Sequence, residues 1–566
     1  MSFDMGIQAY SKRNWIDLSL LAIVFTIWFG YGIGARALWS PDEGRYAEIP
    51  REMAESGDYL TPRLNGVKYF EKPPLVYWLT AGSIKWFGLQ EWAFRLWPAI
   101  LAIISCISVY LLGTVIYNRK SGITAAVVLA TSPFYHIMAG ALTLDMPLAA
   151  LVTVSMTTFL IGVRQTRSLH RRLWLMCFYI FIALAVLTKG LIGIVIPGIV
   201  IGTWIMILGR WHLLREIHLP GGLLVFIIIS APWHVMVSTA NPEFAWFYFV
   251  HEHLERYLTT VHQRYKPVWY FAAVLVLGMF PWSAFLPVQM RGALSRLWRD
   301  RQQHVDTWYL LLWATLPFIF FSASGSKLAP YILPVFPPLA LLIGRTVSRI
   351  WDGSIGMPKS ASWILLFLGT TGALLFAALP WLAAEKISEI HAGREIVWLA
   401  YGLAFAMLIA GSLPILTHRF LENRFQVTQL FASAVLVTVM LSVTLPNLDE
   451  DRSVKSLALS IKQDLRPNDE IANYRNYYQD LPVYIEKRIT LVRWDGELEF
   501  GASVEDTSGW IINESAFYQR WLQPNRMYVF TSNKHQDYLR NFLPGPMCLL
   551  GSTNNVVMLV NRECDS

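Results

Sequence analysis

Charged residues are scarce in this 566-residue sequence, in which Asp, Glu, Lys and Arg together make up only 15% of the chain. Soluble domains carry nearer a quarter of such residues. Hydrophobic residues reach 54%, and the mean hydropathy is +0.40. This shortage of charge excludes a soluble domain for most of the chain and predicts a polytopic α-helical membrane protein.

Nucleotide-binding and nucleic-acid-binding signatures are also lacking. The sequence has no zinc-finger spacing, no Walker loop and no Gly-x-Gly-x-x-Gly after a strand. A net charge of +8 favours nucleic acid in a soluble protein, but here the excess lies largely in short loops between apolar runs. We therefore expect membrane lipids, and no nucleic acid, as partners.

Cysteine is rare, with four residues in the whole chain. Cys106 and Cys177 lie within apolar runs and are expected in the core. Cys548 and Cys564 lie sixteen residues apart near the C-terminus, across an expected hairpin. Two cysteines do not make a disulfide framework, so a bond between them is left open and requires an oxidising compartment.

Long apolar runs are what the sequence has in abundance. The first follows Lys12 and Arg13, is too long for a signal-peptide core and indicates a retained signal anchor with a cytoplasmic N-terminus. Twelve further runs have roughly the length that crosses a bilayer. Together they predict about thirteen transmembrane helices, over residues 15–38, 95–116, 123–140, 146–163, 173–188, 190–208, 220–237, 268–290, 307–321, 331–347, 361–384, 395–416 and 426–445.

Positive charge is concentrated in alternate loops, on the same side as the N-terminus. The positive-inside rule places these basic loops in the cytoplasm. An odd number of helices then puts the chain after Leu445 on the outer face, which is the periplasm if the cell is Gram-negative. The basic loops cover residues 119–120, 164–172, 210–215, 291–301, 345–349 and 418–419.

The polar C-terminal segment, residues 446–566, is predicted to form a periplasmic α/β domain. Short β-rich runs at 470–474, 488–492, 526–531 and 556–560 alternate with helix-like segments at 453–465, 514–522 and 534–542. No catalytic motif occurs in it, so we expect a structural cap or a docking domain. Residues 1–445 are assigned to the membrane-embedded part.

The first external loop, about residues 39–94, holds the densest charged and aromatic stretch. Asp42 and Glu43 directly follow a proline at the helix exit, and Arg45 and Tyr46 come next. The pattern around residues 48–53 predicts a short amphipathic helix at the membrane interface. Chemistry at the membrane face and an ordinary solvated turn are both compatible with this acidic pair.

The second half of that loop contains Tyr69, Glu71 and Lys72, followed by Pro73 and Pro74. The two prolines fix an extended entry into another interfacial helix. A lysine here can bind a lipid phosphate through charge-assisted hydrogen bonds, although interfacial anchoring explains nearby cations equally well.

The other external loops add isolated charges. Asp145 is an acid among apolar residues, and carboxylates at membrane depth are costly and usually functional. Lys189 occupies a tight turn, where it either binds a headgroup phosphate or extends to the interface. Lys327 and Tyr331 offer a cation and a hydroxyl at the start of a helix. The topology places all these loops on one side, which favours a single site.

The fourth external loop contains His251, Glu252, His253 and Arg256. Histidine with nearby acids is typical of a divalent metal such as zinc. Histidines two residues apart on a helix point to different faces, so we expect at most one of them to bind. The hypothesis is a metal held by Glu71 and His253, with His251 as the alternative.

These pieces resemble the GT-C class of integral-membrane glycosyltransferases, which use polyprenyl-phosphate sugars as donors. More narrowly, they are similar to the 4-amino-4-deoxy-L-arabinose transferases that modify lipid A. The resemblance rests on the acidic pair at 42–43, the run at 69–74, Asp145 before Pro147, the 252–256 segment and the 327–334 loop.

The resemblance implies a sugar donor on undecaprenyl phosphate, a lipid A phosphate as acceptor, and transfer with inversion. It implies catalytic roles for Asp42, Glu43 and Asp145. It implies donor or substrate binding by Arg45, Tyr46, Tyr69, Lys72, Lys189, Arg256, Lys327 and Tyr331. Addition of the aminosugar lowers the negative charge of lipid A and gives resistance to polymyxin and other cationic peptides.

Two alternatives stay open at this point. The first is transfer of another sugar to a protein or to O-antigen. The second is a lipid flippase or secondary transporter, for which inverted repeats and mid-membrane polar groups are typical.

Overall fold

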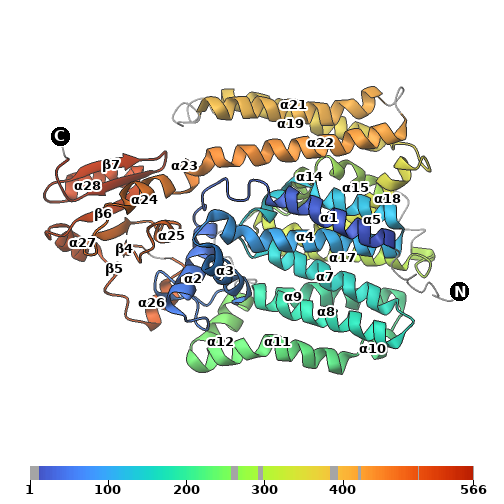
Figure 1. Ribbon diagram of the computed structural model, residues 1–566, viewed down its shortest axis with the longest axis horizontal. Coiled ribbons are helices and arrows are strands. Elements are labelled where there is room, and N and C mark those ends of the chain that lie inside the picture. The colour runs from blue at the N-terminus through green and yellow to red at the C-terminus, as the bar shows by residue number, and fades with distance from the viewer. Residues whose placement is uncertain are drawn as a thin grey trace.

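The structure is a computed structural model that describes residues 12–255, 266–290, 298–382, 393–417, 422–494 and 496–564. A helical bundle carries a sheet-containing domain at one end, and the first described helix, α1, begins toward the opposite end (Figure 1). We call the end that carries this domain the domain end. The helices α19, α21 and α22 form a separate layer along one side of the bundle.

Apolar helices make up the bundle, and most of them coincide with the apolar runs of the sequence. They are α1 (Lys12–Gly30), α4 (Glu91–Ile116), α5 (Arg119–Ala130), α6 (Pro133–Ala139), α7 (Asp145–Val163), α8 (Ser168–Lys189), α9 (Ile192–Leu208), α10 (Leu213–Glu216), α11 (Leu219–Ala240), α12 (Phe244–Trp246), the π-helix η1 (Phe247–Glu255), α14 (Tyr270–Gly278), η2 (Trp282–Phe285), α15 (Leu286–Met290), α17 (Val305–Ala323), η3 (Ala329–Val335), α18 (Phe336–Trp351), α19 (Lys359–Leu382), α21 (Gly393–Thr417) and α22 (Asn423–Thr444).

Within the described ranges, nine helices are long and apolar enough to cross a membrane. The number is eleven if each of two bent pairs counts as one span: α5 with α6 at 68°, and α14 with the segment 282–288 at 112°. The predicted runs 15–38 and 190–208 correspond to α1 and to the 17-residue α9, which are not among them. A polytopic helical protein is confirmed, and the count of thirteen stays a prediction.

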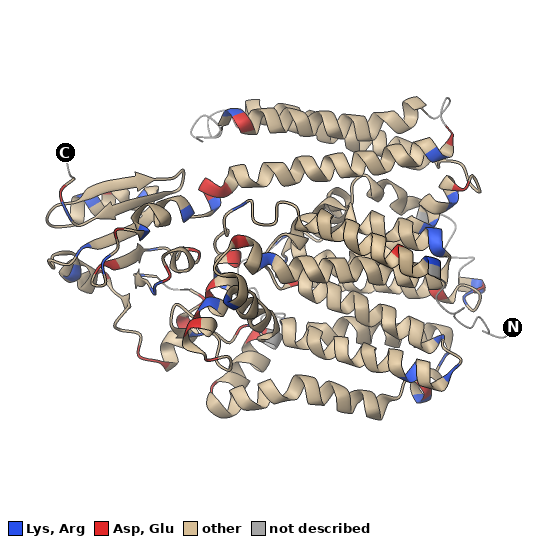
Figure 2. Cartoon of the chain, in the orientation of Figure 1, with Lys and Arg blue, Asp and Glu red and all other residues tan. Residues whose placement is uncertain are grey.

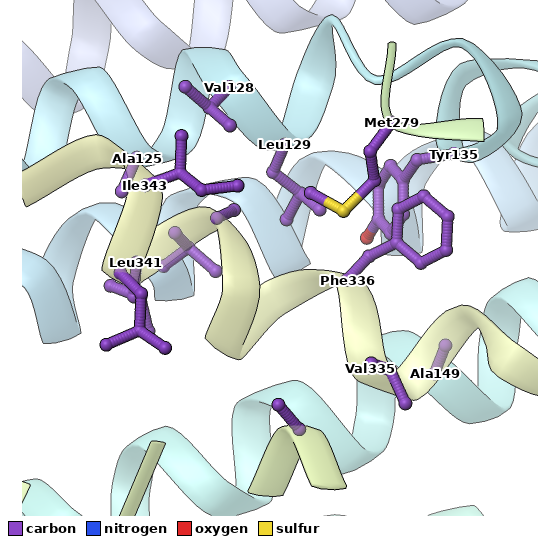
Figure 3. Packing of buried hydrophobic residues seen from close by; sticks show 14 of the residues in the cluster. Ala125, Val128, Leu129, Tyr135, Ala149, Met279, Val335, Phe336, Leu341 and Ile343 are labelled. Carbon is purple, nitrogen blue, oxygen red and sulfur yellow. The ribbon is translucent and has the colours of Figure 1, made fainter. Parts of the chain in front are cut away.

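Close packing of small residues holds the bundle together. A Cβ on Gly344 of α18 would lie 2.5 Å from the Cα of Ala125 on α5, so only glycine allows these two helices to approach this closely. Ile343 and Leu129 lie near this contact, and further along the same helices Phe336 packs beside Tyr135 and Met279 (Figure 3).

Charged residues lie mainly at the two ends of the bundle and are sparse in its middle (Figure 2). The end opposite the C-terminal domain is rich in Lys and Arg, whereas acids and bases mix at the domain end. Because charge at bilayer depth is costly, this distribution suits a helical membrane protein.

The first loop of the chain folds into two helices at the domain end, α2 (Asp42–Ser56) and α3 (Leu75–Phe87), with a small hairpin of β1 (Arg63–Leu64) and β2 (Val67–Lys68) between them. Helices are therefore present where the sequence predicts them, and their place at the membrane interface stays a prediction.

The C-terminal domain is a six-stranded sheet in the order β5-β4-β3-β6-β8-β7. The first four strands are parallel and the last two antiparallel, with helices between them, which confirms the α/β class. Cys548 and Cys564 form a disulfide. The elements are η4 (Leu445–Leu448), α23 (Asp449–Arg452), α24 (Lys455–Lys462), β3 (Glu470–Tyr474), α25 (Leu481–Ile485), β4 (Thr490–Val492), α26 (Glu499–Val504), β5 (Ile511–Ile512), α27 (Glu514–Trp521), β6 (Met527–Ser532), η5 (Asn533–His535), α28 (Gln536–Phe542), β7 (Cys548–Ser552) and β8 (Val556–Val560).

One hydrophobic core joins the first loop to the C-terminal domain. Leu38, Ile49 and Val67 belong to the same buried cluster as Leu481 and Phe530. The C-terminal domain is therefore fixed against the loop that carries most of the candidate site residues.

Candidate active site

Helix α2 places the acidic pair at the junction between bundle and C-terminal domain. The helix begins at Asp42, where the N-terminal dipole favours negative charge. It ends at Ser56 and is capped by Gly57, whose φ of 74° is the left-handed conformation that favours glycine. Asp42 and Glu43 then occupy different environments, because neighbouring helix residues point in different directions.

Glu43 is buried and bound on every side. Its carboxylate accepts hydrogen bonds from Arg36 at 2.5 and 2.9 Å and from Arg95 at 2.9 and 3.0 Å. The backbone N–H groups of Trp39 and Leu142 donate to it as well. Burial alone raises the pKa of Glu43, but the charges of Arg95 and Arg36 outweigh it and bring the pKa down to about 2. Its geometry is that of a structural anchor.

Asp42, in contrast, is largely in solvent. Its side chain is 54% exposed and lies 3.9 Å from the guanidinium of Arg45. The carboxylate is therefore accessible from solvent.

Arg45 is buried and connects three parts of the chain. Its Nε donates to the Gln479 amide oxygen at 3.1 Å, and its Nη1 donates to the Tyr69 hydroxyl at 3.4 Å. Its Nη2 forms an ion pair with Glu497. Tyr46 packs beside it with its ring 6.2 Å from that of Tyr77. Arg45 thus links the first loop to the C-terminal domain.

A cavity of about 310 Å³ brings together residues from four separate loops. Lys72, Asp145, Lys189 and Glu252 supply its charged groups. The rest of its lining is mostly apolar and comes mainly from α9, α17 and η3: Leu191, Ile192, Val195, Phe320, Phe321, Pro330, Tyr331 and Pro334.

The charges in this cavity form two pairs. Lys72 Nζ donates to Glu252 at 3.0 Å and to the backbone carbonyl of Glu71 at 2.7 Å. Lys189 Nζ donates to Asp145 at 2.5 Å and lies 4.6 Å above the ring of Tyr331. The expected co-location of Lys72, Asp145, Lys189 and Tyr331 is observed. The cavity therefore combines two ammonium groups, each paired with a carboxylate, with an apolar wall.

Other predicted site residues lie outside this cavity lining. Lys327 is buried, and its Nζ donates to the Ser324 carbonyl at 2.6 Å. Arg45, Tyr46 and Tyr69 lie on the side of the C-terminal domain. Arg256 falls outside the described residues.

The metal hypothesis gains no support from the described residues. No group of three or more His, Cys, Asp or Glu that could hold an ion occurs among them. Glu71 lies 4.0 Å from the Lys72 ammonium, whose charge disfavours a nearby cation. The His251 ring stacks on Phe247 at 5.0 Å, and the His253 side chain lies outside the described part.

Comparisons with known proteins show the family of this chain. The family model for dolichyl-phosphate-mannose-protein mannosyltransferase matches residues 71–235, and the aminoarabinose transferase C-terminal domain matches residues 457–561. An undecaprenyl phosphate-alpha-4-amino-4-deoxy-L-arabinose arabinosyl transferase from Enterobacter sp. (strain 638) is 32% identical, over 67% of this chain and 68% of that relative. The chain belongs to this aminoarabinose transferase family.

Solved structures extend the likeness across the whole chain. ArnT from Cupriavidus metallidurans, solved bound to undecaprenyl phosphate, has a TM-score of 0.84 at 28% identity, over 98% of this chain and 100% of that one. An Archaeoglobus fulgidus oligosaccharyltransferase shares the fold alone, with a TM-score of 0.50 at 14% identity over 93% and 70% of the two chains. As a member of the aminoarabinose transferase family, the chain is a GT-C type glycosyltransferase and a multi-pass membrane protein.

Several residues around the candidate site had no individual signal in the sequence. Glu252 stood out only as part of a charged loop, and Arg36 and Arg95 resemble ordinary interfacial cations. Gln479 and Glu497 lie more than 400 residues from Arg45, in a domain without a catalytic motif. Only the fold brings them to the site.

Proposed function

We propose that the protein transfers 4-amino-4-deoxy-L-arabinose from undecaprenyl phosphate to phosphate groups of lipid A. The carrying observation is the cavity in which Lys72 and Lys189 face an apolar wall. A polyprenyl phosphate is complementary to both, because its headgroup is anionic and its tail is a hydrocarbon chain. The name of the relatives and the undecaprenyl phosphate bound in the Cupriavidus protein support this donor.

In the proposed reaction, an acceptor phosphate oxygen attacks the anomeric carbon and the bond to the carrier phosphate breaks. The transition state has oxocarbenium character, and the sugar inverts its configuration. Lys72 and Lys189 stabilise the leaving phosphate, exchanging part of their pairing with Glu252 and Asp145 for the phosphate oxygens.

The acids have separate roles in this proposal. A phosphate acceptor is largely ionised near neutral pH and needs little help from a general base. Asp42 and Asp145 are therefore assigned to orienting the acceptor and binding the amino group of the sugar, together with Tyr46, Tyr69 and Tyr331. Glu43 holds the loop in place through its two arginines, and the proposed reaction uses no metal ion.

We also propose the orientation of the chain. The N-terminus and basic loops are assigned to the cytoplasm, and the domain end with the site to the periplasm of a bacterial inner membrane. The Lys- and Arg-rich end of the bundle opposite the C-terminal domain supports this orientation (Figure 2). Residues 1–445 form the membrane part in this proposal, and residues 446–566 form the periplasmic domain.

Mass spectrometry of lipid A tests the function. Cells that carry the gene are expected to add the mass of aminoarabinose to lipid A and to resist polymyxin, and deletion is expected to abolish both. Addition of a different sugar mass, or glycosylation of a protein instead, would contradict the proposal. Transfer by purified protein in detergent, where no gradient exists, excludes the flippase alternative.

A further inference from the structure

A short segment of the C-terminal domain lies between two loops of the site. The Phe500 ring of α26 stacks on Phe247 of η1, with 3.8 Å between centroids and 16° between planes. The same ring lies 6.5 Å from Phe70 in the first loop. Phe70 precedes Lys72 by two residues, and Phe247 lies on the π-helix that carries Glu252. Phe500 therefore touches both segments that hold the Lys72–Glu252 pair.

Neighbouring contacts fix this segment firmly. A Cβ on Gly501 would lie only 2.2 Å from the Lys68 carbonyl oxygen, so the backbones meet directly. Glu505 accepts two hydrogen bonds from Arg63, each at 3.0 Å, and a third from the Lys68 backbone at 3.1 Å. Movement of this segment would move the first loop with it.

Three residues earlier than Phe500, Glu497 binds Arg45. Glu497 pairs with the Arg45 Nη2 and accepts a hydrogen bond from Gln479, which itself accepts from the Arg45 Nε at 3.1 Å. Arg45 also holds the Tyr69 hydroxyl and faces Asp42. Two side chains of the C-terminal domain thus occupy one side of the guanidinium, while candidate site residues occupy the other.

We propose that the C-terminal domain is part of the catalytic apparatus and that Glu497 is a positioning residue. Glu497 holds Arg45 in the orientation that places Asp42 and the Tyr69–Lys72 segment, and Phe500 fixes the two loops around the Lys72–Glu252 pair. This inference rests on the proposed function for its assay.

The charge arrangement explains why a carboxylate is needed at this position. Burial raises the pKa of Glu497, the charge of Arg45 opposes this, and the charge of Glu71 raises the pKa again. The acids of both domains therefore share one buried cation. Without the Glu497 charge, the guanidinium is expected to turn toward the remaining carboxylates, Asp42 among them, and displace them from the substrate. A cap that only covers the site would not require this.

The experiment compares Glu497→Gln with Glu499→Gln, an identical change at an exposed position two residues away. With full-length protein in detergent, lipid-linked aminosugar donor and lipid A, Glu497→Gln is expected to lower kcat/KM for the donor on the order of tenfold to a hundredfold. Glu499→Gln is expected to match wild type, and Glu497→Asp to recover part of the loss. Wild-type kcat/KM in Glu497→Gln with an intact fold would overturn the proposal.

A double-mutant cycle separates positioning from general stability. If Glu497 acts through Arg45, the Arg45→Gln/Glu497→Gln double variant loses no more activity than Arg45→Gln alone. Losses that multiply would overturn the proposal. If Glu497→Gln unfolds, the same cycle with Glu497→Asp decides the question.

The proposed function and this inference fail differently. If the wild-type protein transfers no aminosugar, the proposed function is refuted. The positioning role of Glu497 is then tested by measuring the binding of undecaprenyl phosphate. In that assay, Glu497→Gln is expected to weaken binding and Glu499→Gln to leave it unchanged. Equal binding by both variants counts against the inference.

Discussion

Asp42 and Glu43 are adjacent in sequence, yet the structure gives them opposite surroundings. Glu43 lies among two arginines and two backbone N–H groups, whereas the Asp42 side chain is 54% exposed. Conservative amide substitutions should therefore separate a structural acid from a functional one.

Glu43→Gln is expected to destabilise the protein on the order of 3 kcal/mol, because two buried arginines lose their countercharge. The readout is a lower Tm in detergent and a lower yield of folded protein. Asp42→Asn is expected to keep the wild-type Tm while lowering aminosugar transfer. Wild-type turnover in Asp42→Asn would remove Asp42 from the mechanism, and an unchanged Tm in Glu43→Gln would refute its anchoring role.

Lys72→Ala is expected to lower kcat/KM by about a hundredfold to a thousandfold, because the leaving phosphate loses a preorganised cation. Lys72→Arg should recover part of this activity, since the charge remains. The matched control is Lys85→Ala, which removes an exposed lysine of α3 outside the cavity. An Ala variant at position 72 with wild-type transfer would contradict the assignment of the cavity.

At the scale of elements, helix α2 connects the acidic pair of the candidate site to the rest of the first loop. Its first turn carries Asp42, Glu43 and Arg45, and its second half carries an acid cluster. In that cluster Glu48 binds Arg51 at 2.6 and 2.7 Å, and Glu52 accepts the Gly66 N–H at 3.0 Å. The helix therefore ties the hairpin of the first loop to the acidic pair.

The acid cluster in the second half of α2 predicts that the stability of the protein depends on pH. Burial, followed by the charge of Glu48, raises the pKa of Glu52 from 4.5 to about 8. Folding thus favours the protonated acid, so its contribution to stability is complete below about pH 4.5 and is lost as the pH rises through about 8. Glu52→Gln is expected to flatten the fall of Tm over this range.

The control for this measurement is Glu55→Gln, on the same helix with a side chain that is 67% exposed. It should leave the pH profile of the Tm as in wild type. A Tm of Glu52→Gln that falls with pH as steeply as that of wild type would refute the role of Glu52.

At the scale of the whole molecule, one buried cluster extends from the first loop into the sheet of the C-terminal domain. The disulfide joins Cys548 to Cys564, which are 16 residues apart in the sequence, at the edge of that sheet. Stability of the domain and order of the site should therefore change together.

Cys564→Ser is expected to destabilise the C-terminal domain by about 3 kcal/mol, the usual effect for a loop of this length. Because the core is shared, the Tm should fall and aminosugar transfer should become more sensitive to heat. Treatment of the wild type with reductant should reproduce the effect and leave Cys564→Ser unaffected. A wild-type Tm for Cys564→Ser would contradict this coupling.

Local patterns in the sequence were sufficient for the class and for many elements. Apolar runs locate the helices because a segment that crosses a bilayer must satisfy its own backbone and present apolar side chains. The strands at 470–474 and 556–560 and the helix beginning at Glu514 appear at their expected positions. The quoted motifs of the outer loops were sufficient for the resemblance to the GT-C family.

Only the tertiary structure decided which residues meet. The ion pairs form between side chains that lie far apart in the sequence, and no local pattern predicts them. Lys72 meets Glu252 across 180 residues, and Arg45 meets Glu497 across more than 400. Buried charges require partners, and the fold supplies them from whichever segment lies within reach. The sequence by itself determined a membrane glycosyltransferase with an acidic first loop. The fold decided that Glu43 is bound by two arginines, that Asp42 is exposed, and that the C-terminal domain reaches the site.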